Sequence, residues 1–143
     1  MAPDDLVEIR LPPAKPDLYL RWVAFTRAVV EQLEMHQPFR EAEAKLPSAV
    51  LGSQVFENEV VPAAAREAEV AEQEHRIAMP VVQISRGSAR SIMEAILIRA
   101  EWLGLYEGVD RLDLLGIPQP DDEMMDLYLR AVSAIRDVAF GAA

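Results

Sequence analysis

Cysteine is absent from this chain of 143 residues, and aromatic residues make up only 6% of it. Without cysteine there is no disulfide, no thiolate-bound zinc, no iron–sulfur cluster and no cysteine nucleophile. Since 51% of the residues are apolar but few are aromatic, the core must consist mainly of Ala, Val, Leu, Ile and Met. A core of this composition favours helices that pack at close range.

Long apolar runs are also missing. No run reaches the roughly 18–20 residues that a helix needs to cross a bilayer. The first ten residues, MAPDDLVEIR, are acidic and do not show the charged-then-apolar order of a signal peptide. We therefore expect a cytoplasmic protein without membrane contact, in the host cytoplasm if a phage encodes it.

Positive charge is scarce, because 14 Lys and Arg stand against 24 Asp and Glu, and the formal net charge is −10. An acidic surface repels phosphate backbones at long range. Net charge therefore does not support nucleic acid as a partner, and any such contact would need a local basic patch.

Proline divides the chain into segments. Residues 1–16 alternate Val7, Ile9 and Leu11 with polar residues and end in PPAKP, which is typical of an extended arm with one short strand outside the helical core. Residues 17–143 are predicted to form a single α-helical domain, with amphipathic stripes at 17–36, 88–103 and 121–140. The predicted fold class is mainly α, a helical bundle or hairpin with an extended N-terminal arm and at most one or two short β-strands.

Shorter segments complete this reading. PFREAEAKL predicts a short helix, and a separate helix opens at Pro62. Residues 48–61 are ambiguous between helix and strand, with spacing that favours helix. VVQIS, at residues 81–85, is either a strand or a crossing segment.

The helix at 88–103 is apolar on more than one side. Ile98 and Trp102 fall near Glu94 and Glu101 on a helical wheel, on the side that should face water. Either this helix is central in its own domain, or another chain covers it. For the second case the predicted interface consists of Ile92, Ile96, Ile98, Trp102, Leu103, Leu105 and Tyr106.

Two patterns suggest ligands, and each has a plainer alternative. Glu72 and His75 form a Glu-x-x-His pair, which ferritin-like di-iron proteins use, although a solvated acidic face explains it as well. In SRGSAR, Ser88 is predicted to cap a helix, with Ser91 as the alternative cap. Arg86 and Arg90 lie beside this helix start and are either a candidate anion-binding pair or solvated arginines of a capped turn. We assign no catalytic, metal-binding or cofactor-binding residue and expect no cofactor.

The segment RSIMEAILIRAEWLGLYEGVDRLDLLGIP, residues 90–118, resembles a part of the small terminase subunits of tailed phages. In that family a long helix ends near an Arg-Ala or Arg-Arg pair, and a Leu-Gly-Leu turn and an extended segment follow. The matching residues are Arg99 to Tyr106 and then Val109 to Ile117. The resemblance implies a helical hairpin that assembles a ring, and an extended segment that enters a barrel around the channel.

These observations predict a non-enzymatic helical subunit that binds other protein subunits, most of all copies of itself, with phage DNA packaging or head assembly as the specific hypothesis. A second hypothesis is an acidic adaptor or inhibitor of a basic protein, based on the acidic face around Glu67, Glu69, Glu72 and Glu74. A ferritin-like di-iron carboxylate protein is the third.

Overall fold

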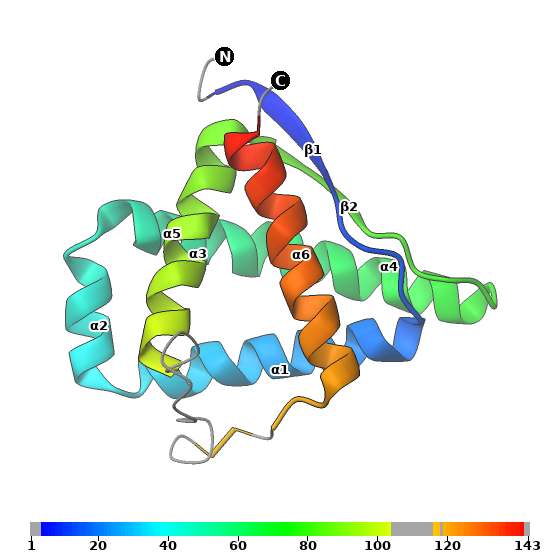
Figure 1. The fold of residues 1–143 in the computed structure, drawn as a ribbon, viewed down its shortest axis with the longest axis horizontal. Helices are drawn as coiled ribbons and strands as arrows, with labels where there is room; N and C mark the ends of the chain where they lie inside the picture. The colour runs from blue at the N-terminus through cyan, green and yellow to red at the C-terminus, as the bar shows by residue number, and fades with distance from the viewer. Residues whose placement is uncertain (1–3, 104–115, 118, 142–143) are drawn as a thin grey trace.

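A computed structural model describes residues 4–103, 116–117 and 119–141 of the chain. Helices dominate it, and two short strands form an antiparallel ribbon, which confirms the predicted mainly α fold class (Figure 1). The elements in order are β1 (Leu6–Arg10), α1 (Pro16–Glu34), α2 (Gln37–Ala44), α3 (Pro47–Val55), the π-helical turn η1 (Phe56–Val60), α4 (Val61–Gln73), β2 (Val81–Ser85), α5 (Arg86–Leu103) and α6 (Asp122–Phe140).

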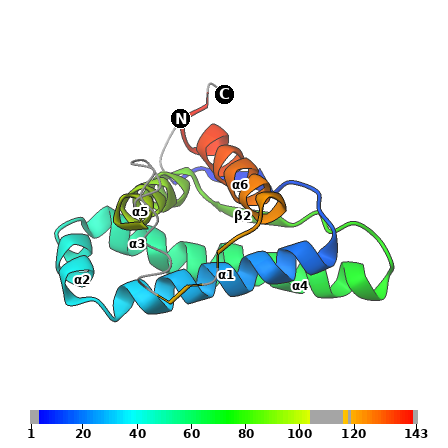
Figure 2. The same cartoon turned by 60° about the horizontal axis from the view of Figure 1, so that its bottom comes forward.

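The helices form two layers. One layer contains α1 beside the continuous run of α3, η1 and α4, and the other contains α5 beside α6 (Figure 2). Helix α5 packs on α3, and α2 closes the same end of the molecule. The β1–β2 ribbon runs along α6, on the side away from α5 (Figure 1).

Proline begins the first three helices, in the first turn of each. The amides of a first helical turn have no partner within the helix, so proline loses nothing there. Helix α6 is capped instead by Asp121, the residue before it, whose Oδ1 accepts a hydrogen bond of 2.8 Å from the Met124 amide. Local chemistry of this kind explains why the helices at 17–36, 38–46 and 121–140 are predicted correctly.

The segment 48–61 is helical, but Pro62 does not open a separate helix as expected. Residues 47–73 run from α3 through η1 into α4 without a break. A proline inside a helix removes one hydrogen bond, and its ring crowds the carbonyl four residues earlier. The widened turn Phe56–Val60 lies where that crowding falls, so a π turn accommodates Pro62 and the helix continues.

The N-terminal arm contains the predicted strand, but it is part of the core, so the expectation that it lies outside is wrong. β1 pairs antiparallel with β2, in the register Ile9↔Val82, and an isolated bridge between Ala14 and Ala78 extends the pairing. Ile9 is fully buried and Leu11 is 3% exposed. Every second residue of a strand faces the same side, so the alternation in the arm marks a face that packs on the helices.

Helix α5 is covered on two sides by its own chain. Ile92, Met93 and Ile96 join the main core cluster with residues from α1, α4 and α6. Ile98 and Leu103 join a second cluster, which α1, α2 and α3 supply. The central-helix alternative therefore accounts for Ile98, which is 8% exposed without any second chain.

Candidate functional site

The residues predicted to form an interface lie mostly inside the single chain. Ile92, Ile96, Ile98 and Leu103 are between 0% and 8% exposed, because both core clusters include them. Trp102 is partly exposed, and its ring packs edge-on against Phe39 at 5.8 Å between centroids. Leu105 and Tyr106 lie outside the described residues. The apolar second side of α5 thus needs no partner to keep it dry.

One surface of α5 that was not predicted from the sequence faces solvent. Leu97 is 48% exposed and Leu46, just after α2, is 46% exposed. Together with Trp102 they line a groove of about 590 Å³ between α2 and α5. Glu94 and Glu101 stand at this groove, and neither forms an ion pair with a described residue. This α2–α5 groove combines exposed aliphatic side chains with two carboxylates that no described residue pairs.

A second groove, of about 790 Å³, lies between the β-ribbon and α6. Three large apolar side chains along it are about half exposed, namely Met79 (57%), Val81 (49%) and Leu129 (57%). Arg10 and Arg130 also line it, with Asp137 at the α6 side. This ribbon–α6 groove and the α2–α5 groove lie on opposite sides of the α5–α6 pair (Figures 1 and 2).

A third groove, of about 480 Å³, is acidic and lies between α1 and the η1–α4 segment. Glu31, Glu34 and Glu57 line it with Arg27, and Met35 is 70% exposed beside them. Oε1 of Glu57 also accepts a hydrogen bond of 2.7 Å from Nη2 of the buried Arg99.

The charge balance around Glu57 is unfavourable. Burial raises the pKa of the Glu57 carboxyl, Arg99 opposes this, and the nearby Glu34 and Glu43 raise the pKa further. The Glu57 carboxyl therefore lies near two further carboxyl groups, and a cation bound beside it would lower its pKa.

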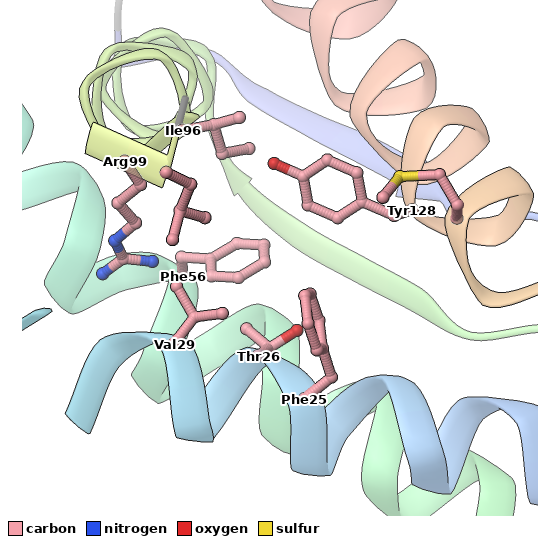
Figure 3. Close-up of a pocket in the computed structure, with 9 residues that line it drawn as sticks. Phe25, Thr26, Val29, Phe56, Ile96, Arg99 and Tyr128 are labelled. Carbon is pink, nitrogen blue, oxygen red and sulfur yellow. The ribbon is translucent and has the colours of Figure 1, made fainter. Parts of the chain in front are cut away.

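A small cavity lies between the two layers. Its volume is about 40 Å³, and Phe25, Phe56, Ile96 and Tyr128 surround it among the described residues. Figure 3 shows the Tyr128 ring reaching from α6 toward Ile96 on α5, above the two phenylalanine rings. Ligand pockets usually measure about 300–1,000 Å³, so this space is a packing gap with room for a water molecule or two.

The candidate anion-binding arginines hold the end of a helix. Arg86 is 8% exposed and donates from Nη1 to the Val138 carbonyl at 2.7 Å, and Arg90 donates from Nε to the Ala139 carbonyl at 3.0 Å. The last carbonyls of a helix lack partners and carry partial negative charge, which a guanidinium neutralises. These bonds to α6 account for both arginines without a bound anion.

The residues at the start of α5 also differ from the prediction. Ser85 caps this helix in place of Ser88, because Ser85 Oγ accepts from the Ser88 amide at 3.0 Å. The serine one residue before the helix is therefore the one that satisfies an amide of the first turn.

The Glu-x-x-His pair does not form a helical metal motif. Helix α4 ends at Gln73, and His75 has a φ of 56°, so Glu72 and His75 do not share a helical face. Within the described ranges, no group of three or more His, Asp or Glu side chains is arranged to hold a metal ion. The prediction of this pair on one face is wrong, because the helix stops earlier than its composition suggests.

The predicted acidic face on α4 is reduced by ion pairs. Arg76 binds Glu67 and Glu74 at 2.7 Å each, and the Met79 amide also donates to Glu67. Glu69 and Glu72 remain exposed. Only part of this face is therefore available to a basic partner.

Comparisons with protein-family models, curated proteins and solved structures found no match to this chain. Among the described residues, none of the helices combines the length and apolar character required to cross a membrane. The described residues form a mainly α-helical fold with an antiparallel ribbon, and their surface carries the two apolar grooves and the acidic groove named above.

Proposed function

We propose that this chain is a non-enzymatic subunit that acts by binding other protein chains, a second copy of itself above all, through the α2–α5 groove. The observation that carries the proposal is the pair of half-exposed leucines, Leu46 and Leu97, that flank a partly exposed Trp102. Aromatic and aliphatic side chains gathered in a concave surface are typical of binding sites for protein segments.

The test is self-association of the full chain by sedimentation, with a matched pair of variants. Leu97 on α5 and Leu51 on α3 are 48% and 49% exposed, but only Leu97 lines the groove. Leu97→Asp should weaken association by at least about tenfold, while Leu51→Asp should leave it unchanged. A wild-type chain that remains monomeric at high micromolar concentration would refute self-association through this groove.

The more specific proposal, a phage DNA-packaging or head-assembly subunit, is based on the resemblance of residues 90–118 to small terminase subunits. Of that segment, residues 104–115 and 118 lie outside the described residues, so the resemblance stays a prediction. Neighbouring genes for a large terminase and a portal protein would support it, and an unrelated operon would count against it.

A second candidate function is an adaptor or inhibitor that binds a basic protein. The acidic groove favours it, because Glu31, Glu34 and Glu57 line it together with the exposed Met35. Binding of poly-lysine should weaken with added salt, and Glu31→Gln with Glu34→Gln should weaken it more than Glu69→Gln with Glu72→Gln does. Salt-independent binding, or equal effects of the two pairs, would contradict a role for this groove.

A further inference from the structure

The two apolar grooves differ in their charged residues, and this difference bears on how two copies can meet. The α2–α5 groove has Glu94 and Glu101 without a cationic partner among the described residues. At the ribbon–α6 groove, Arg10 and Arg130 stand beside Leu129. One groove therefore offers surplus negative charge, and the other offers arginines beside an exposed aliphatic side chain.

The arginines of the ribbon–α6 surface are held only weakly within their own chain. Arg10 is paired with Glu8, and its side chain is 81% exposed. Arg130 approaches Asp126 at 3.6 Å, with side chains 53% and 67% exposed. Exposed pairs of this kind contribute little, so both arginines can exchange partners at small cost. The remaining acid of the groove, Asp137, has Arg136 3.5 Å away.

Contact between like surfaces is disfavoured. If two α2–α5 grooves faced each other, Glu94 and Glu101 of both copies would meet without a cation from either groove. The net charge of −10 disfavours contact of two copies in every orientation, so association needs local charge complementarity. If the α6 surface of one copy entered the groove of the next, two arginines would face two glutamates, and Leu129 would pack against Leu46 and Leu97.

We propose that copies of this chain associate head to tail, with the Leu129–Arg130 edge of α6 in one copy seated in the α2–α5 groove of the next. This inference rests on the proposed function, self-association, and adds the partner surface and the direction. Because the two surfaces lie on opposite sides of the α5–α6 pair, each copy can use both at once (Figures 1 and 2). Such a heterologous contact builds closed rings or open chains, not isolated two-fold dimers.

Charge reversal on each surface tests the inference. One variant carries Glu94→Lys and Glu101→Lys, and the other carries Arg10→Glu and Arg130→Glu. Each variant alone should associate at least about tenfold more weakly than the wild type, because its two surfaces then have like charge. An equal mixture should recover association, since each reversed surface meets the opposite charge on the other variant.

Two control variants change the net charge equally at positions that line neither groove. They are Glu69→Lys with Glu72→Lys and Arg27→Glu with Arg66→Glu, and all four residues are exposed. Circular dichroism confirms that every variant is folded. Controls that weaken association as much as the groove variants would overturn the inference, because the effect would then be one of net charge.

The remaining outcomes separate the two proposals. Suppose that the wild type associates, and that the glutamate reversal weakens association but the arginine reversal does not. The head-to-tail contact is then refuted, while self-association through the α2–α5 groove stands. If reversed variants fail to rescue each other in the mixture, the pairing of these two surfaces is refuted. A monomeric wild type refutes both.

Discussion

A Cβ placed on Gly52 would lie 1.8 Å from the carbonyl oxygen of Ser91. Helices α3 and α5 therefore cross so closely that only a hydrogen fits between them at this point. Ser48 and Ser91 mark the same crossing, with their hydroxyl oxygens 2.9 Å apart. Close backbone approach of this kind usually depends on a glycine.

Gly52→Ala should therefore destabilise the protein by about 3 kcal/mol or more, because the two helices must separate. Gln54→Ala, on the exposed side of the same helix, should change the free energy of unfolding by less than about 0.5 kcal/mol. Urea unfolding followed by circular dichroism measures both. Equal stability of the two variants would show that α3 and α5 do not meet as described.

Removing one partner of the Glu57–Arg99 ion pair should destabilise the protein, because the other partner then lacks its opposite charge. Arg99→Met leaves the partly buried Glu57 carboxylate without its counter-charge, and should cost about 1–3 kcal/mol. Replacing both residues with methionine should cost less than the sum of the single changes, because no unpaired charge remains. A double-mutant cycle in unfolding free energy measures the coupling, and strict additivity would contradict it.

The end of α6 should fray without its two arginine caps. Arg86→Met should destabilise the protein by about 1–2 kcal/mol, and Arg90→Met by less, because Arg90 is exposed. Amide hydrogen exchange near Gly141, whose N–H binds the Asp137 carbonyl, should become faster. Arg136→Met, on the exposed face of α6, is the control and should leave this exchange unchanged.

Stability should fall in acid through Glu67. Hydrogen bonds from Arg76 and from the Met79 amide hold the pKa of Glu67 below its ordinary value. A carboxyl with a lowered folded-state pKa binds fewer protons when folded, so it stabilises the fold above its unfolded pKa of about 4.3, and this contribution is lost as pH falls through the folded pKa. Glu67→Gln should therefore flatten the loss of stability in acid, whereas Glu69→Gln, at an exposed position, should not.

Glu57 should lower the stability of the protein as pH rises, which is the opposite of the effect of Glu67. Burial raises its pKa, so the folded protein binds this proton more readily than the unfolded chain does. Its contribution is fully present below the unfolded pKa and is lost as pH rises through the folded pKa. Glu57→Gln should remove this loss of stability above the unfolded pKa. Unfolding free energies of both chains measured as a function of pH test this difference in slope.

The two tryptophans should report on different surroundings. Trp22 is 1% exposed, whereas Trp102 is partly exposed beside Phe39. Acrylamide should quench the tryptophan fluorescence of the Trp22→Phe variant, which retains only Trp102, more strongly than that of the Trp102→Phe variant, which retains only Trp22. Phe39→Ala should increase quenching of Trp102 further. If the proposed self-association is correct, quenching of Trp102 should fall as protein concentration rises, and constant quenching would contradict it.

Local patterns in the sequence predicted most of the elements. The stripe from Leu18 to Leu33 and the stripe at 121–140 specify two helices through chemistry within a few residues, whereas the β-branched run at 81–85 left a strand and a crossing segment open. The candidate site could be predicted less well from the sequence. Periodicity showed that Ile98 and Trp102 needed cover, but it could not show that α1, α2 and α3 of the same chain provide it.

The sequence by itself therefore determined the helical class, the acidic surface and most helix starts, although not those at Pro62 and Ser88, because these features depend on neighbours along the chain. Only the tertiary structure decided which apolar residues stay exposed, as the contrast between Ile98 and Leu97 shows. It also placed Arg86 and Arg90 on the carbonyls of α6, about 50 residues away along the chain. Such partners depend on how helices cross in space, and the spacing of apolar residues along one helix does not specify which other helix crosses it.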